Sequence, residues 1–209
     1  MRPLLFTLCV LASWPVLAND TAALEAAVQA HERGDVAGAR QALEALSRQG
    51  VPAADYNLGV IALDAGQPAD AARWMERAAR AGFVTAMVGL GRLHDTGRLG
   101  RADLPQAQRW FTLAAEAGSV DAMVEVATAF YLGRGAVRDR TAAARWYREA
   151  ANGGDVGAQY LLAAMYESGD GVEADLRLAR YWYDIAAKNG DEAAPSKLKE
   201  LDARLKAAS

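Results

Sequence analysis

The chain has 209 residues, with 23 basic and 26 acidic side chains, and close to a quarter of its residues are alanine. Alanine has the highest helix propensity and a small side chain to bury, so this composition predicts closely packed helices. A formal net charge of −3 does not provide the basic face that nucleic-acid-binding proteins use, and we expect no nucleic-acid partner.

The first eighteen residues have the pattern of a secretory signal peptide. Arg2 precedes an apolar run over 4–14, and Val16 and Ala18 are small residues suited to cleavage after residue 18. The run is shorter than the roughly 20 residues that span a bilayer; an uncleaved anchor is the alternative. The single cysteine, Cys9, lies within this segment. We therefore expect a periplasmic or secreted mature chain without disulfides and without membrane insertion.

A repeat of 36 residues organises the rest of the chain. Tryptophan, and glycine eight residues later, recur at this spacing at Trp74, Trp110, Trp146 and Trp182 and at Gly82, Gly118, Gly154 and Gly190. A period of this length is typical of a solenoid, in which each repeat buries its apolar face against its neighbours. The pattern predicts helix hairpins over 22–50, 54–82, 86–118, 122–154 and 158–190, with a charged cap over 191–209.

Each hairpin carries its own start and stop residues. The first helix ends in a glycine-containing loop, and an aspartate follows where the second helix needs an N-cap, at Asp103, Asp139 and Asp175. The second helix carries the tryptophan and closes at the repeat-end glycine, which adopts a left-handed conformation at little cost. We interpret the glycine column as helix ends and the tryptophan column as core anchors.

The fifth hairpin resembles the Sel-1-like repeat. Residues 166–175 read Tyr-Glu-Ser-Gly-Asp-Gly-Val-Glu-Ala-Asp, and an Ala-Arg-Tyr-Trp-Tyr stretch over 179–183 follows. The fourth hairpin is similar, whereas the third has His94 in place of the aromatic residue and Leu99 in place of a loop glycine. This family is related to the tetratricopeptide repeat, so the resemblance implies an all-α, right-handed solenoid of about five hairpins. It covers 54–190 well and 22–50 weakly.

The sequence offers little for catalysis. His31 and His94 lie in different repeats without the spacing of a zinc site, and no serine lies in a GxSxG or SxxK context. We therefore predict no catalytic residue, no metal site and no cofactor. Some cysteine-rich secreted relatives bind or hydrolyse β-lactams, so the resemblance leaves a cell-wall-directed or β-lactam-recognising protein or enzyme as the alternative. The disulfide-paired repeats of those relatives are absent here.

The remaining candidates for function lie on the surface of the first helices, which line a concave groove in solenoids of this kind. Projecting the tetratricopeptide pattern gives nine outward positions: Tyr56, Asn57, Arg92, Asp95, Glu125, Thr128, Tyr131, Tyr160 and Glu167. Tyrosine combines apolar area with a hydroxyl at low entropic cost, so the three tyrosines are the predicted anchors, and Arg92, Glu125 and Glu167 would set the polarity of the partner.

These features predict a non-catalytic protein–protein interaction module, an adaptor or regulator in the cell envelope that binds another protein or peptide. Two further alternatives are that the groove residues are simply solvated, and that the chain is a structural spacer. The sequence leaves the identity of the partner and the oligomeric state open.

Overall fold

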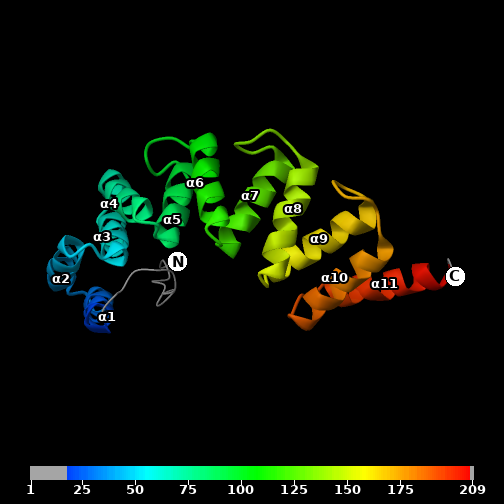
Figure 1. Cartoon of the computed structure of the whole chain (residues 1–209), viewed down its shortest axis with the longest axis horizontal. Helices are drawn as coiled ribbons and strands as arrows, with labels where there is room; N and C mark the ends of the chain where they lie inside the picture. The colour runs from blue at the N-terminus through cyan, green and yellow to red at the C-terminus, as the bar shows by residue number, and fades with distance from the viewer. Residues whose placement is uncertain (1–17, 208–209) are drawn as a thin grey trace. The chain divides into compact units, whose positions relative to one another are not determined.

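The computed structural model describes residues 18–207, which form eleven α-helices and no strand. The helices are α1 (Ala18–Glu32), α2 (Val36–Arg48), α3 (Pro52–Asp64), α4 (Pro68–Arg80), α5 (Val84–Asp95), α6 (Leu104–Glu116), α7 (Val120–Leu132), α8 (Arg140–Asn152), α9 (Val156–Ser168), α10 (Leu176–Lys188) and α11 (Ala194–Ala207). Short turns and loops join helices of similar length, as Figure 1 shows. The predicted signal peptide falls on residues 1–17, outside the described part of the chain, and on Ala18.

Four pairs of consecutive helices pack as hairpins, and further contacts join neighbouring helices of successive repeats. α1 packs against α2, α3 against α4, α7 against α8 and α9 against α10. Contacts between successive hairpins join α2 to α3, α4 to α5, α6 to α7 and α8 to α9, and α11 packs against α10. This nearest-neighbour packing is that of an α-solenoid, so the predicted fold class is confirmed.

The helices divide into two compact units, with the boundary between Arg101 and Ala102. Unit 1 contains α1–α5, and its core includes the fully or nearly fully buried Ala39, Leu43 and Ala54. Unit 2 contains α6–α11, and its core is built largely from small alanines. The boundary lies in the loop between α5 and α6, within the segment 86–118 that the sequence predicts as the third hairpin.

The predicted helix caps are confirmed. The carboxylates of Asp103 and Asp139 each accept a hydrogen bond from the backbone N–H of the residue three positions later in the chain, at 3.1 and 2.9 Å. The Asp175 carboxylate accepts two such bonds, from Arg177 and Leu178, at 2.8 and 3.0 Å. The repeat-end glycines all have positive φ, between +83° and +98°, and so end the second helices in the expected left-handed conformation.

Glycines in two loops of unit 2 allow one repeat to pack closely on the repeat before it. A Cβ on Gly135 would lie 2.5 Å from the carbonyl oxygen of Leu104, the first residue of α6. A Cβ on Gly171 would collide in the same way with the carbonyl oxygen of Arg140, the first residue of α8. Both glycines also have positive φ. The corresponding position in the preceding loop is Leu99, 36 residues before Gly135, and leucine cannot make so close an approach.

The four repeated tryptophans lie at the margin of the cores. All four are half-buried; Trp146 and Trp182 pack against the core of unit 2, and Trp74 packs against that of unit 1. The residue after each tryptophan is the buried one: Met75, Phe111, Tyr147 and Tyr183. Neighbouring residues on an α-helix point about 100° apart, so the helix presents this second column to the core. This column is not evident from the 36-residue repeat, because its four residues differ in type.

Candidate functional site

The nine predicted groove residues lie on first helices of both units. Tyr56 and Asn57 lie on α3, and Arg92 and Asp95 on α5, in unit 1; Glu125, Thr128 and Tyr131 lie on α7, and Tyr160 and Glu167 on α9, in unit 2. In unit 2 we call the side chains of Glu125, Thr128, Tyr131, Tyr160, Leu161 and Glu167 the first-helix face. Leu161 joins this set because it is exposed and lies 36 residues after Glu125.

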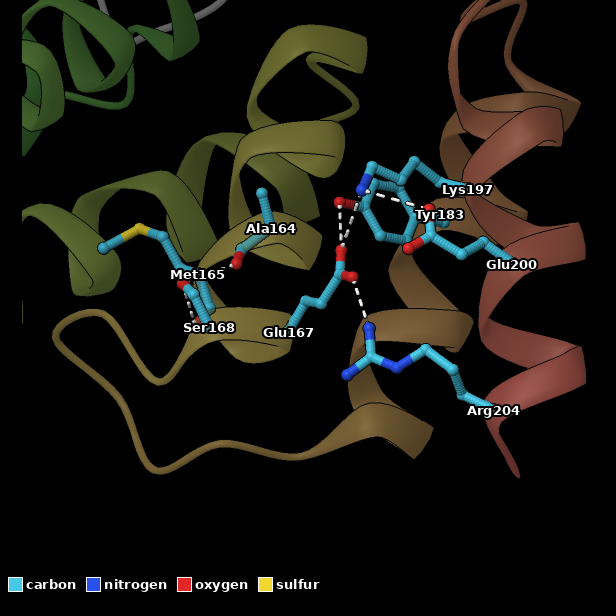
Figure 2. A network of polar contacts seen from close by, with 8 residues as sticks. All are labelled: Ala164, Met165, Glu167, Ser168, Tyr183, Lys197, Glu200 and Arg204. Carbon is cyan, nitrogen blue, oxygen red and sulfur yellow. Dashed lines mark hydrogen bonds and ion pairs between the residues drawn. The ribbon is translucent and has the colours of Figure 1, made fainter. Parts of the chain in front are cut away.

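Glu167 is held by side chains of α10 and α11 (Figure 2). Its carboxylate lies 2.7 Å from the Arg204 guanidinium and 3.5 Å from the Lys197 ammonium. It also accepts a hydrogen bond from the Tyr183 hydroxyl at 3.0 Å. Only 14% of the Glu167 side chain is exposed. The predicted groove carboxylate therefore binds the capping helix of its own chain, and its role toward a partner stays a prediction.

Tyr183 is the buried centre of this cluster. Its side chain has no exposed surface, and its ring lies edge-on to the Tyr160 ring, with centroids 5.1 Å apart. Burial raises the pKa of the Tyr183 hydroxyl well above its ordinary value, and the hydrogen bond to Glu167 and that carboxylate's charge act in the same direction. Tyr160, predicted as an anchor for a partner, thus packs against a core tyrosine on one of its sides.

The preceding repeat has an equivalent arrangement around Tyr147. Its hydroxyl is hydrogen-bonded to the Thr128 hydroxyl at 3.0 Å, and its ring lies edge-on to Tyr131 at 6.5 Å. Burial raises the pKa of Tyr147, and the Thr128 hydrogen bond acts in the opposite direction. Two more predicted groove residues are therefore brought together, and each touches the core.

Arg140 packs over the ring of Tyr131. Its guanidinium lies 3.7 Å from the centre of the Tyr131 ring and forms an ion pair with Asp170. Because Arg140 is half-buried, these contacts fix the side chain at the start of α8. Arg140 therefore has a packing role in unit 2.

The unit 1 candidates are also tied to their surroundings. The Tyr56 ring packs on Phe83, with centroids 5.6 Å apart. Burial raises the pKa of Tyr56, and the positive charge of Arg92 acts in the opposite direction. The Asn57 amide donates to the Ala53 carbonyl at 2.8 Å within its own helix. Arg92 is exposed, so it is the most accessible predicted residue of this group.

A buried carboxylate in unit 1 has a structural role. The Asp55 Oδ2 atom lies 2.9 Å from Nε of Arg77, and Arg77 also donates to the carbonyl and hydroxyl of Ser47 at 2.7 and 2.8 Å. Burial raises the pKa of Asp55, while Ser47 and Arg77 act to lower it. These contacts tie α2, α3 and α4 together.

The sequence pattern did not predict the basic residues that complete the cluster in Figure 2. Lys197 and Arg204 belong to the segment 191–209, for which the prediction was a charged cap. The repeat spacing could have indicated their place. Lys197 lies 36 residues after Leu161, so α11 occupies the position of another first helix. Leu201, fully buried, anchors that helix.

Within residues 18–207 no group of three or more His, Cys, Asp or Glu side chains is arranged to hold a metal ion. None of the helices in that range has both the length and the apolar character to cross a bilayer. The polar clusters around Tyr183 and Tyr147 join neighbouring helices, which is a structural use of these residues.

Comparison with known proteins identifies the repeats. Residues 52–83, 84–119, 120–155 and 156–191 each match the Sel1 repeat, in agreement with the resemblance predicted over 54–190. Among solved structures, the chain is similar to c5321, a protective antigen present in uropathogenic Escherichia coli strains that displays an SLR fold. The sequence identity is 27% and the TM-score 0.76, over 85% of this chain and 40% of that one.

It is also similar to a Sel1 repeat protein from Oxalobacter formigenes, with 25% identity and a TM-score of 0.72 over 90% of this chain and 81% of that one. A comparison with curated protein sequences gave no match. The chain thus spans less than half the length of c5321 and most of the length of the Oxalobacter protein.

Proposed function

The chain belongs to the Sel1 repeat family, and from this premise we propose that it is an exported, non-catalytic scaffold that binds another protein or peptide through its first helices. Sel1 repeat proteins are typically protein–protein interaction modules. The single observation that carries the proposal is that exposed first-helix residues vary between repeats whose buried alanines recur, as at Ala127 and Ala163. Glu125 and Leu161 occupy one repeat position, yet they differ in charge and polarity.

The chemistry of the first-helix face supports binding rather than catalysis. On this face the Glu167 carboxylate and the Thr128 hydroxyl are engaged in contacts that join helices. An acid or base catalyst needs a proton-transferring group that can reach the substrate. The family is generally a non-catalytic scaffold, and a cell-envelope adaptor or regulator is the role that we assign.

Export is the second part of the proposal. Residues 1–18 support it, because a positively charged residue, Arg2, precedes an apolar run, as in a secretory signal peptide. Expression of the full chain in a bacterial host, followed by fractionation and N-terminal sequencing, tests this part. A mature protein beginning at Asn19 in the periplasm or medium is the expected result. A chain that retains Met1 in the cytoplasm would refute it.

A matched pair of leucine variants tests the proposed surface. Leu161 on the first helix α9 is 41% exposed, and Leu113 on the second helix α6 is 48% exposed. Each is replaced by lysine, and the two proteins and wild type serve as baits for cross-linked capture from the producing cells. We expect one protein that wild type and Leu113→Lys recover and that Leu161→Lys loses. Equal recovery by all three baits would show that the binding surface does not include Leu161 on α9.

The alternative, a β-lactam-recognising protein or enzyme, is tested on the same preparations. A chromogenic β-lactam assay and a fluorescent penicillin label detect hydrolysis and covalent capture. We expect neither above the level of buffer. Hydrolysis at a rate shared by the variants, together with failed protein capture, would favour the alternative.

A further inference from the structure

We propose that a pocket of unit 2, separate from the first-helix face, binds a carboxylate group attached to a small apolar moiety, such as the end of a peptide. The pocket has a volume of about 390 Å³ and lies between α8, α9, α10 and the loop before α10. This volume falls within the range of pockets that hold small molecules. Its polar lining comes from Arg148, Tyr166, Glu173 and Asp175, of which Arg148 and Tyr166 are the hydrogen-bond donors.

Arg148 supplies the positive charge of the pocket. Its Nη2 atom donates to the Tyr166 hydroxyl at 2.7 Å, and it forms no ion pair with any residue in 18–207. A guanidinium has five N–H donors in a fixed planar arrangement that matches a carboxylate. The Tyr166 hydroxyl accepts from Arg148, so its own hydrogen is free to point to a ligand oxygen. The two side chains together therefore present a charged donor and a neutral donor to one space.

The remaining lining residues of the pocket disfavour highly charged anions. Val172 and Leu178 supply apolar surface, and Leu178 is 40% exposed. Glu173 and Asp175 also line the pocket. The Asp175 carboxylate caps α10 through the N–H groups of Arg177 and Leu178, and the positive end of the helix offsets part of its charge. Two nearby carboxylates would repel a phosphate more strongly than a single carboxylate, which restricts the ligand to one weak negative charge with an apolar neighbour.

The pocket residues depart from the repeat pattern. In the preceding repeat the places of Arg148, Tyr166 and Leu178 are held by Thr112, Phe130 and Ala142. This combination occurs once among residues 18–207. The hydrogen bond between Arg148 and Tyr166 joins α8 to α9, and a ligand would account for the guanidinium donors that this bond leaves over.

N-acetyl-L-leucine and its uncharged amide, N-acetyl-L-leucinamide, are the probes for the test. They are titrated at millimolar concentrations into ¹⁵N-labelled protein, and NMR follows the Arg148 Nε–H signal and the backbone signals of 172–178. We expect saturable shifts with the acid only. Arg148→Gln should weaken binding about tenfold or more, because a charge-assisted hydrogen-bonded pair is lost. The control Arg145→Gln, an exposed arginine on the same helix, should bind like wild type.

Arg148→Lys covers the case in which Arg148→Gln fails to fold, since lysine keeps the charge and an apolar stem but lacks the planar donors. Weaker binding by this variant, with an unchanged circular dichroism spectrum, supports the proposal. Equal shifts with the acid and the amide, unchanged affinity in both Arg148 variants, or no saturation with the acid would overturn it. Because the pocket lies apart from the first-helix face, none of these results bears on protein capture by Leu161.

Discussion

The Tyr183 hydroxyl, on a side chain with no exposed surface, donates a hydrogen bond to the Glu167 carboxylate at 3.0 Å. The same carboxylate contacts Lys197 and Arg204 from the capping helix. One acidic side chain thus satisfies a buried hydroxyl and fixes α11 at the C-terminal end of unit 2 (Figure 2). Removing its charge should therefore loosen the cap as well as the core contact.

Glu167→Gln is expected to lower the free energy of unfolding by about 1–2 kcal/mol. Glutamine keeps the shape and one acceptor oxygen for Tyr183, but the ion pairs with the half-exposed Lys197 and Arg204 are lost, and such pairs contribute modestly each. Urea unfolding at low and high salt measures the effect, which should shrink at high salt because ions screen the wild-type pairs.

The matched control is Glu200→Gln, which removes only the exposed contact between Glu200 and Lys197 at 3.5 Å. We expect it to change stability by less than about 0.5 kcal/mol. If the two variants unfold at the same urea concentration, Glu167 does not hold the cap.

Stability should fall at alkaline pH because the pKa of Tyr183 is raised in the folded state by burial and by Glu167. Below the unfolded-state pKa of about 10, the hydroxyl is protonated in both states and its contribution is fully present. Above that pH the unfolded chain releases the proton while the folded chain retains it. Each such group then costs up to about 1.4 kcal/mol per pH unit, until the folded pKa is passed.

Tyr183→Phe should be less stable than wild type at neutral pH and less sensitive to pH above 10. Tyr181→Phe, at an exposed neighbouring position, should keep the wild-type dependence. Free energies of unfolding measured between pH 8 and pH 11 check this. A Tyr183→Phe protein with the full alkaline loss would show that Tyr56 and Tyr147, whose pKa values are also raised, account for it.

The sequence predicted the local features of the fold well, because each depends on residues close together in the chain. Asp139 and Gly154 mark the start and end of α8 through contacts within a few residues. Those features repeat every 36 residues and are visible without a structure. The direction of the core within the second helix was harder to predict, since Trp146 and Tyr147 are both large and apolar.

The candidate site was predicted less well, because it depends on contacts between repeats. Glu167 was assigned outward from its helix position alone, yet Arg204, 37 residues later, reaches it from α11. Long side chains from a neighbouring helix are not specified by a helical pattern.

Gly171→Ala should destabilise unit 2 by about 3 kcal/mol or more. A Cβ there would collide with the Arg140 carbonyl oxygen, and the positive φ adds strain for any other residue. Gly190→Ala is the control, because Gly190 has positive φ but no atom within 4 Å of a built Cβ. It should cost only about 1–2 kcal/mol. Thermal unfolding followed by circular dichroism compares them, and equal losses would rule out close loop packing.

Tyr147→Ala should cost more than Trp146→Ala, although tryptophan is the larger residue and the repeated one. Tyr147 is 3% exposed, so truncation leaves a cavity in the core and should cost about 3–5 kcal/mol. Trp146 is half-buried against the same core, and we expect about 1–2 kcal/mol, because part of its surface already contacts water and less area is lost on truncation. Tyr147→Phe isolates the hydroxyl bonded to Thr128 and should cost about 1 kcal/mol. Urea unfolding of the three variants gives the order of their stabilities. A larger loss of unfolding free energy in Trp146→Ala than in Tyr147→Ala would show that the tryptophan, and not the tyrosine, is the main core residue of this helix.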